Sequence, residues 1–299
     1  LNAKVGAITV KDAIVGLEHH DPTDVIVVIS KPPAKEVRDE VVALLQKCTK
    51  PVVAIFLGEK PENHEGKVYL AHTLEETARM AVDLANGDPI KDNYCDPIDY
   101  EVSRPLAADK TVKGLYSGGS LAAEAGMLIA EALNLGGLIK EEGYILKTGG
   151  YEVVDLGDDV YTQGKPHPMI DPEVRIKKIL ECAKDPQTGV ILLDCMLGYG
   201  CHPDMAGALA PAIREAQKIA KADGRELYFV ASVCGTRQDP QDYDRAVAEL
   251  KECGVLVEES NARAIRLALK LKGIDYKENT RGHVEAAVDE TPLPEPDEK

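Results

Sequence analysis

The stretch at residues 189–206, GVILLDCMLGYGCHPDMA, constrains the fold of this chain more than any other part of it. A continuous apolar run leads into a turn with two glycines, and Pro203 and Asp204 then open a helical pattern. A strand, a tight turn and a helix start in this order are typical of α/β proteins. The first N–H groups of such a helix are unpaired and lie at the positive end of its dipole. The pattern therefore predicts either an anion site or an ordinary βα connection.

Five residues of this turn are candidates for binding a phosphate or carboxylate: Gly198, Gly200, Cys201, His202 and Asp204. The two glycines let the backbone approach a ligand closely, which side chains would prevent. His202 is the candidate catalytic residue. The alternative is that His202 is a partly exposed polar residue of a simple turn.

A second turn of the same kind lies at residues 117–120. Ser117, Gly118, Gly119 and Ser120 follow an apolar run and precede the helical pattern LAAEAGMLIAEALN. Serine is a preferred N-cap residue, so we expect Ser120 to cap this helix. The turn is a second candidate anion site.

Cationic and polar side chains stand near two further turns. The segment GKPHPMIDPEVR contains Lys165, His167 and Arg175, and VCGTRQDP contains Thr236 and Arg237 after an apolar run. Arginine binds phosphate or carboxylate with two parallel hydrogen bonds, so these residues are candidates for substrate binding. The alternatives are solvated charges, salt bridges between domains and, for Arg237, an ion pair within its own loop.

The rest of the chain alternates between strand and helix patterns. Residues 24–30 and 51–58 are short β-branched apolar runs, typical of buried parallel strands, and residues 34–48 between them are amphipathic. Thr73 is the expected N-cap of a later helix, with Glu76 as its capping-box partner. Alternation of this kind predicts parallel sheets with helices on both faces.

Composition shifts divide the chain into two domains and a tail. A loop rich in Pro, Asp and Tyr predicts a linker at residues 88–109, with α/β domains at residues 1–87 and 110–275. Residues 276–299 are acidic and contain three prolines, so we expect a disordered or ancillary tail.

The two domains also resemble each other in sequence. DPTDVIVVIS parallels DPQTGVILLD, and VYLAHTLEETARMAVDLA parallels VLVEESNARAIRLALKL. The alternative is chance likeness between amphipathic segments. An internal duplication predicts two flavodoxin-like, doubly wound domains related by a pseudo-twofold axis, with the strand ends near Ser30 and Leu197 facing a shared cleft.

Composition excludes several classes of protein. The chain has 35 Lys and Arg against 51 Asp and Glu, and this net charge of −16 argues against nucleic acid and anionic membranes as partners. We expect a soluble protein because no apolar run approaches the roughly 20 residues of a membrane span and no leader pattern is present. Because the chain opens with Leu1, we also expect residues upstream of it.

Seven cysteines without a CxxC pair favour the reducing cytoplasm. We expect no metal site, because Cys195, Cys201, His167 and His202 lack the spacing of zinc ligands. A covalent role for Cys201 is an alternative to the anion site, because a helix start lowers the pKa of a thiol.

Four segments of the chain resemble the FdrA family: NAKVGAITVKDAIVGLE, LYSGGSLAAEA, VDLGDDVYTQGKPHPMIDPEVR and LLDCMLGYGCHPDMAGALAPAI. The paired domains of that family are similar to the C-terminal domains of the α and β subunits of succinyl-CoA synthetase. The likeness covers residues 2–271. It implies two synthetase-like domains, without the N-terminal CoA-binding Rossmann domain that would precede Asn2 in a full-length member.

The resemblance implies a subunit of an oxamate carbamoyltransferase in allantoin and purine breakdown. Its expected ligand is carbamoyl phosphate or another acyl phosphate, and its expected partners are other subunits in a homo- or hetero-oligomer. The synthetases themselves carry phosphate on a histidine in a Gly-His-Ala-Gly-Ala loop, but here the matching strand is followed by EKPENHEGKVYLAH. His64 lacks the small neighbours of that loop and is expected in a surface loop.

Three functional hypotheses remain. The first is a carbamoyl or acyl-phosphate transferase that needs no cofactor. The second is a CoA ligase, which would use CoA and a nucleotide. The third is a noncatalytic scaffold subunit.

Overall fold

The computed structural model describes residues 3–139, 141–277, 280–285 and 291–293. The chain forms two compact units: unit 1 consists of residues 1–96 and 277–299, and unit 2 of residues 97–276. Each unit has a mostly parallel sheet between helices, which confirms the predicted doubly wound α/β class. None of the described helices is both long and apolar enough to cross a membrane.

Unit 1 contains three helices and five strands in its described part. They are α1 (Ile8–Glu18), β1 (Ile26–Ser30), α2 (Lys35–Leu45), β2 (Val52–Phe56), β3 (Asn63–Glu65), β4 (Val68–Leu70), α3 (Leu74–Ala85) and β11 (Gly282–Val284). The strand order is β1-β2-β4-β3-β11, with β1, β2 and β4 parallel. In β2, Val52, Ala54 and Phe56 pack with α1 and α2 in one core, while Val53 and Ile55 are buried on the opposite face.

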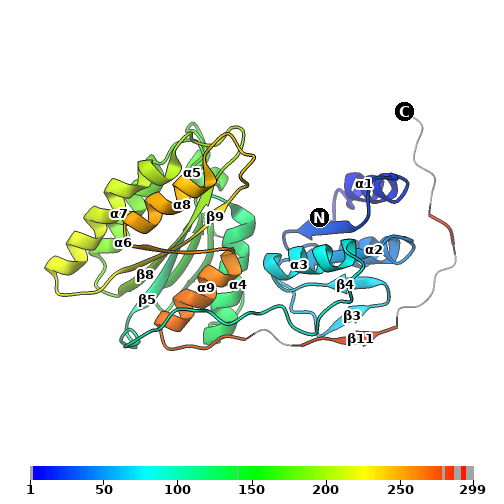
Figure 1. Ribbon diagram of the computed structural model, residues 1–299, viewed down its shortest axis with the longest axis horizontal. Helices are drawn as coiled ribbons and strands as arrows, with labels where there is room; N and C mark the ends of the chain where they lie inside the picture. The colour runs from blue at the N-terminus through cyan, green and yellow to red at the C-terminus, as the bar shows by residue number, and fades with distance from the viewer. Residues whose placement is uncertain (1–2, 140, 278–279, 286–290, 294–299) are drawn as a thin grey trace. The chain divides into compact units, whose positions relative to one another are not determined.

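Unit 2 has a six-stranded sheet of order β10-β9-β8-β5-β7-β6. Its elements are β5 (Thr111–Tyr116), α4 (Gly119–Leu133), β6 (Tyr144–Thr148), β7 (Tyr151–Asp155), α5 (Asp159–Thr162), α6 (Glu173–Lys184), β8 (Thr188–Met196), α7 (Met205–Ala222), β9 (Tyr228–Cys234), α8 (Tyr243–Glu252), β10 (Val255–Glu258) and α9 (Asn261–Leu271). Helices α6, α7 and α8 cover one face of this sheet, and α4 and α9 cover the other (Figure 1).

One pair of strands in unit 2 departs from the expected parallel order. Strand β6 runs antiparallel to β7, and the two are joined by Gly149 and Gly150. Both glycines have positive φ, 56° and 84°, as a tight hairpin turn with two left-handed residues requires. The Gly-Gly pair between two β-rich segments was the available sequence signal for this hairpin.

The repeat expected from the sequence has a matching topology in each unit. The parallel order β1-β2-β4 in unit 1 corresponds to β8-β9-β10 in unit 2. The last helix of each repeat also begins in the same way: Thr73 caps α3 by accepting the Glu76 N–H, and Ser260 caps α9 by accepting the Arg263 N–H. These parallels support an internal duplication.

Unit 2 begins earlier than predicted, whereas its end at Tyr276 lies one residue from the predicted end at residue 275. Residues 97–109 belong to unit 2 rather than to a linker, because the side chain of Ile98 is buried in its core and Leu106 N–H donates to Leu271 O at 2.8 Å. The segment after Tyr276 groups with unit 1.

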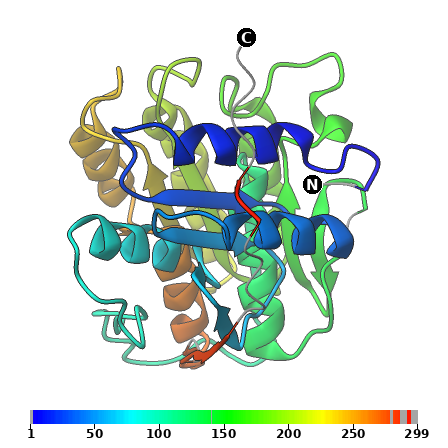
Figure 2. The same cartoon turned by 90° about the vertical axis from the view of Figure 1, so that its right-hand side faces the viewer.

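The acidic C-terminal segment contributes a strand instead of lying apart as an ancillary tail. Strand β11 pairs in parallel with β3 (Figures 1 and 2). Next to it, the nearly buried Arg281 forms an ion pair with both carboxylate oxygens of Glu76. The expected disorder at residues 278–279, 286–290 and 294–299 lies outside the described residues.

We predict that Thr73→Ala will lower the stability of unit 1 by about 1 kcal/mol, because the variant loses the oxygen that accepts the Glu76 N–H at the start of α3. Thr73→Ser keeps that oxygen and should lose clearly less. Urea unfolding of both variants measures the difference. Equal losses would show that the methyl group of Thr73, and not its hydroxyl, carries the effect.

Candidate functional site

The candidate site lies at the carboxyl edge of the sheet in unit 2, between the ends of β5 and β8. These strands are neighbours, but the chain leaves β5 into α4 on one face and leaves β8 into α7 on the other. Such a switch point is where open α/β sheets bind ligands. All the residues nominated from the sequence lie in loops or helix starts that follow β5, β7, β8 or β9.

A carboxylate of the chain itself occupies the expected anion position after β5. Asp194 of β8 is fully buried. Its Oδ1 lies 2.9 Å from the Ser117 N and 3.0 Å from Ser117 Oγ, and its Oδ2 lies 2.7 Å from the Gly118 N. Helix α4 begins at Gly119 with Gly118 as N-cap, so Ser120 is not the cap. The Asp194 carboxylate therefore already accepts the N–H groups that would bind an anion at this turn.

Arg175, predicted to contact substrate, is instead a core residue. Its side chain is fully buried, and Nη2 lies 3.0 Å from Asp194 Oδ1 and 2.5 Å from Asp194 O. Its Nε and Nη1 atoms are buried without a described hydrogen-bond partner. The guanidinium balances the buried charge of Asp194 and is not exposed to a ligand in this structure.

Most of the amides after β8 also have partners within the chain. Cys201 N–H donates to Gly198 O, His202 N–H donates to Met169 O, and Asp204 N–H donates to the Nδ1 of His202. Pro203 has no N–H. Among residues 200–204, Gly200 alone has an N–H for which no partner is described.

Helix α7 begins at Met205, not at Pro203, and Asp204 is its N-cap. The Asp204 carboxylate accepts the Gly207 N–H at 3.0 Å and pairs with Arg245 at 2.8 Å. The predicted cradle of backbone amides is thus not open in this conformation, because a carboxylate of the chain already caps the helix start.

The structure does bring the two nominated histidines into one assembly. Met169 bridges their segments: its N–H donates to the Nδ1 of His167 at 3.2 Å, and its carbonyl accepts the His202 N–H at 2.7 Å. The ring of His167 also packs against Gly157, where a Cβ atom would come within 2.4 Å of Nε2 and within 2.9 Å of Ser117 O. Only glycine fits at that point.

The hydrogen bonds fix the same tautomer on both histidines. In each ring Nδ1 accepts a backbone N–H, from Met169 in one case and from Asp204 in the other. A nitrogen that accepts a hydrogen bond carries no proton, so the neutral ring carries its hydrogen on Nε2. His167 and His202 are both half-buried, and the Nε2 of His167 lies against Gly157. In the neutral form each ring carries one Nε2–H group.

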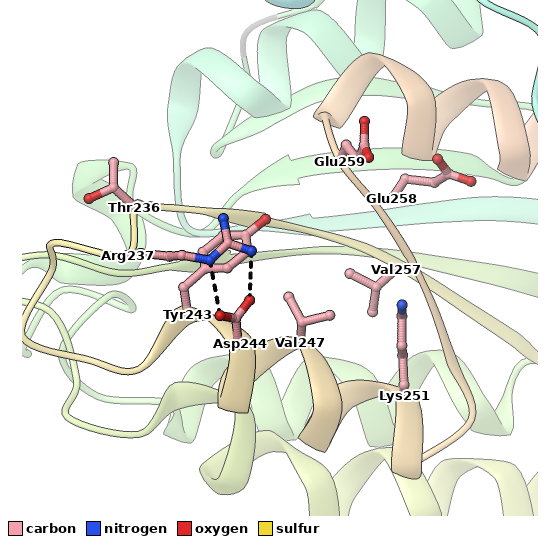
Figure 3. Close-up of a pocket in the computed structure, with 10 residues that line it drawn as sticks. Thr236, Arg237, Tyr243, Asp244, Val247, Lys251, Val257, Glu258 and Glu259 are labelled. Carbon is pink, nitrogen blue, oxygen red and sulfur yellow. Dashed lines mark hydrogen bonds and ion pairs between the residues drawn. The ribbon is translucent and has the colours of Figure 1, made fainter.

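Arg237 and Thr236 lie on the rim of a hollow of about 490 Å³ between the end of β9, α8 and β10 (Figure 3). Arg237 stacks over the ring of Tyr243 and pairs with Asp244, where its hydrogen bonds hold the pKa of the carboxyl below its usual value. The structure favours the interpretation of Arg237 as part of an ion pair. Its partner is Asp244 of α8 and not a residue of its own loop.

The remaining nominated side chains lie at the surface or in turns. Lys165 is exposed in the loop before α6. Thr236 is exposed, and its Oγ1 accepts the Gln238 N–H while its own N–H donates to Asp239. These bonds make the loop after β9 an ordered turn.

A covalent role for Cys201 does not fit its surroundings. Burial raises the pKa of the thiol, and the nearby Asp239 carboxylate raises it further. A thiol needs a lowered pKa to act as a nucleophile at neutral pH. Among the described residues, no group of three or more His, Cys, Asp and Glu side chains is placed to hold a metal ion.

Two histidines of unit 1, His64 and His72, are hydrogen-bonded at Nδ1 within the protein. His64 lies in strand β3, not in a surface loop, and its Nδ1 accepts the Leu70 N–H at 3.0 Å. Burial lowers the pKa of His64, and the charge of Arg281 lowers it further. The side chain of His72 is 3% exposed, and its Nδ1 lies 2.9 Å from Glu59 O.

Asp194 and Met169 were not expected in the site from the sequence. The signal for Asp194 was an acid inside an apolar strand pattern, since such a residue is buried and needs a partner. Met169 had no such signal, because it acts through its backbone N–H and carbonyl groups.

Comparison with known proteins shows what the chain is similar to. A protein-family model described as CoA-ligase matches residues 115–271, which all lie in unit 2. The uncharacterized protein YahF of Escherichia coli (strain K12) is 35% identical over 285 residues, which are 90% of this chain and 54% of that protein. The chain therefore spans about half the length of this curated relative.

Proposed function

The chain belongs to the CoA-ligase family, and we propose that it serves there as an FdrA-like subunit of a carbamoyltransferase that acts on carbamoyl phosphate or a related acyl phosphate. The observation that carries the proposal is the pair of Nε2–H donors on His167 and His202, joined through Met169 at the switch point of the sheet. The histidines lie in two of the four segments that carry the resemblance to FdrA proteins, within GKPHPMIDPEVR and GYGCHPDMA.

The proposed chemistry is transfer by direct displacement. A nitrogen of the acceptor attacks the carbonyl carbon of carbamoyl phosphate, the bond from that carbon to the bridging oxygen breaks, and phosphate leaves with the electron pair. The proton that the acceptor nitrogen loses goes to the departing phosphate. Negative charge grows on the carbonyl oxygen and on the phosphate. Neutral Nε2–H groups of His202 and His167 would stabilise this charge, since fixed donors lower the barrier most where charge develops.

This role needs neither a nucleophilic thiol nor helix-start amides. It therefore agrees with the raised pKa of Cys201 and with the two helix starts that Asp194 and Asp204 already occupy. It differs from our sequence-based expectation in that side-chain donors replace the backbone cradle, and in that Arg175 and Arg237 pair with Asp194 and Asp244.

The test of the proposed function is a transfer assay with radiolabelled carbamoyl phosphate and oxamate, in the presence and absence of proteins encoded by neighbouring genes. We expect labelled, carbamoylated oxamate and an equal amount of phosphate, at a rate that rises when the partner subunits are added. Phosphate release without a carbamoylated product would show hydrolysis only. If neither product forms in any combination, the scaffold hypothesis replaces this one.

We predict that incubation with ATP or GTP and Mg²⁺ will leave no acid-labile, base-stable phosphate on the chain. His64 and His72, the histidines that follow β2, are tied to Leu70 and Glu59 by hydrogen bonds at Nδ1, and His72 is nearly buried. A succinyl-CoA synthetase labelled in parallel serves as the positive control. Phosphate recovered on either histidine would favour the CoA ligase instead.

A further inference from the structure

Gln241, in the loop between β9 and α8, holds both ends of the turn that contains His202. Its Oε1 accepts the Gly198 N–H at 2.9 Å, and its Nε2 donates to Gly198 O at 3.0 Å and to His202 O at 3.3 Å. One side chain therefore contacts the first and the last residue of the turn at residues 198–202. A carboxamide suits this place because it is both a donor and an acceptor.

The turn needs such a clamp because its own backbone is permissive. Gly198 and Gly200 have φ values of 132° and 84°, which are left-handed conformations that glycine adopts easily and also leaves easily. Between them Tyr199 is 90% exposed and packs against little of the protein. Within the turn, the bond from Cys201 N–H to Gly198 O, at 3.2 Å, closes it across only three residues.

The loop that carries Gln241 is itself well ordered. Asp239 accepts the Thr236 N–H at 2.5 Å, Thr236 Oγ1 accepts the Gln238 N–H at 3.1 Å, and Asp239 N–H donates to Thr236 O at 3.2 Å. Gln241 thus ties the turn at residues 198–202 to an ordered loop.

We propose that Gln241 is a positioning residue for the transfer reaction, which acts by fixing the backbone of residues 198–202 and thereby the direction of the His202 Nε2–H. This inference rests on the proposed function. His202 is held at its N–H by Met169 and at Nδ1 by Asp204, and Gln241 supplies the third restraint, at the carbonyl. Misplacing a catalytic donor by about 1 Å can cost roughly 100-fold in rate.

A double-mutant cycle with His202 tests the role in the reaction. Gln241→Ala should lower kcat by roughly 10- to 100-fold and change KM less. In the His202→Ala background the same substitution should lower kcat less than about twofold further, because residues that act through one another are not additive. Gln238→Ala, an exposed glutamine of the same loop, is the matched control and should be unchanged. Equal losses in both backgrounds would overturn the proposal.

A second measurement tests the clamp without any activity. The chain contains no tryptophan, so Tyr199→Trp places a single reporter at the tip of the turn. Its fluorescence anisotropy should fall when Gln241→Ala is added and should stay constant when Gln238→Ala is added. If neither Gln241→Ala nor Gln238→Ala changes the anisotropy, Gln241 does not restrain the turn. That result would leave the proposed function standing. A protein with this clamp but no transferase activity in any combination of subunits would overturn the proposed function, and the role of Gln241 with it.

Discussion

Asp194→Ala should destabilise unit 2 by about 3–5 kcal/mol, the loss typical of a buried ion pair from which one partner is removed. The substitution would leave the Arg175 guanidinium as an uncompensated charge in a fully buried place. It would also leave the N–H groups of Ser117 and Gly118 without their acceptor. Thermal and urea unfolding followed by circular dichroism would measure the loss.

Asp244→Ala is the matched control for this prediction. It removes an exposed carboxylate whose partner, Arg237, is also exposed, so the melting temperature should stay at the wild-type value. Arg175→Met is a second comparison, because it removes the buried cation but leaves Asp194 to accept the amides after β5. If Asp194→Ala and Asp244→Ala have the same melting temperature, the buried pair of Asp194 and Arg175 does not stabilise the switch point.

His202→Ala should lower kcat for carbamoyl transfer by about 10²–10³, which is the usual effect of removing one donor to a developing oxyanion. The side chain is half-buried in a turn and supports little of the core, so the melting temperature should change little. His167→Ala should also lower kcat. Steady-state kinetics and thermal unfolding of the same preparations would separate the two effects.

His20→Ala is the control for the histidine variants. His20 is exposed, and its Nδ1 lies 2.9 Å from Thr23 Oγ1 in its own turn, so its removal should change neither kcat nor stability. A large loss of melting temperature in His202→Ala, with a parallel loss of active protein, would show that His202 is structural.

Local patterns in the sequence predicted much of the fold. The run at residues 51–58 became β2, which is buried throughout, as continuous β-branched segments in a parallel sheet are. The run at residues 24–30 became β1, but β1 is an edge strand whose Val27 and Ile29 are exposed on one face. Thr73 was identified as an N-cap because capping depends on only a few neighbouring residues. Strand β11 escaped prediction because its three residues are all exposed and its anchor, Arg281, pairs with Glu76 at a separation of 205 residues.

The candidate site was predicted only in part, and for the same physical reason. His167 and His202 could be named from their glycine- and proline-rich surroundings. That Met169 joins them is a contact between loops after different strands, which no local pattern contains. At both helix starts a carboxylate of the chain, Asp194 or Asp204, accepts backbone N–H groups. The sequence could not show this, because a strand, a glycine turn and a helix look alike whether the acceptor is a ligand or the protein itself.

The most direct test of the account is the ¹⁵N spectrum of the imidazole rings, with His167 and His202 assigned from their alanine variants. We predict that both rings show the neutral tautomer with hydrogen on Nε2, and that carbamoyl phosphate shifts the Nε2 signals of both while the signal of His20 stays in place. Rings that exchange between tautomers, or a ligand that shifts only His64 or His72, would contradict the claim that His167 and His202 bind the reacting group.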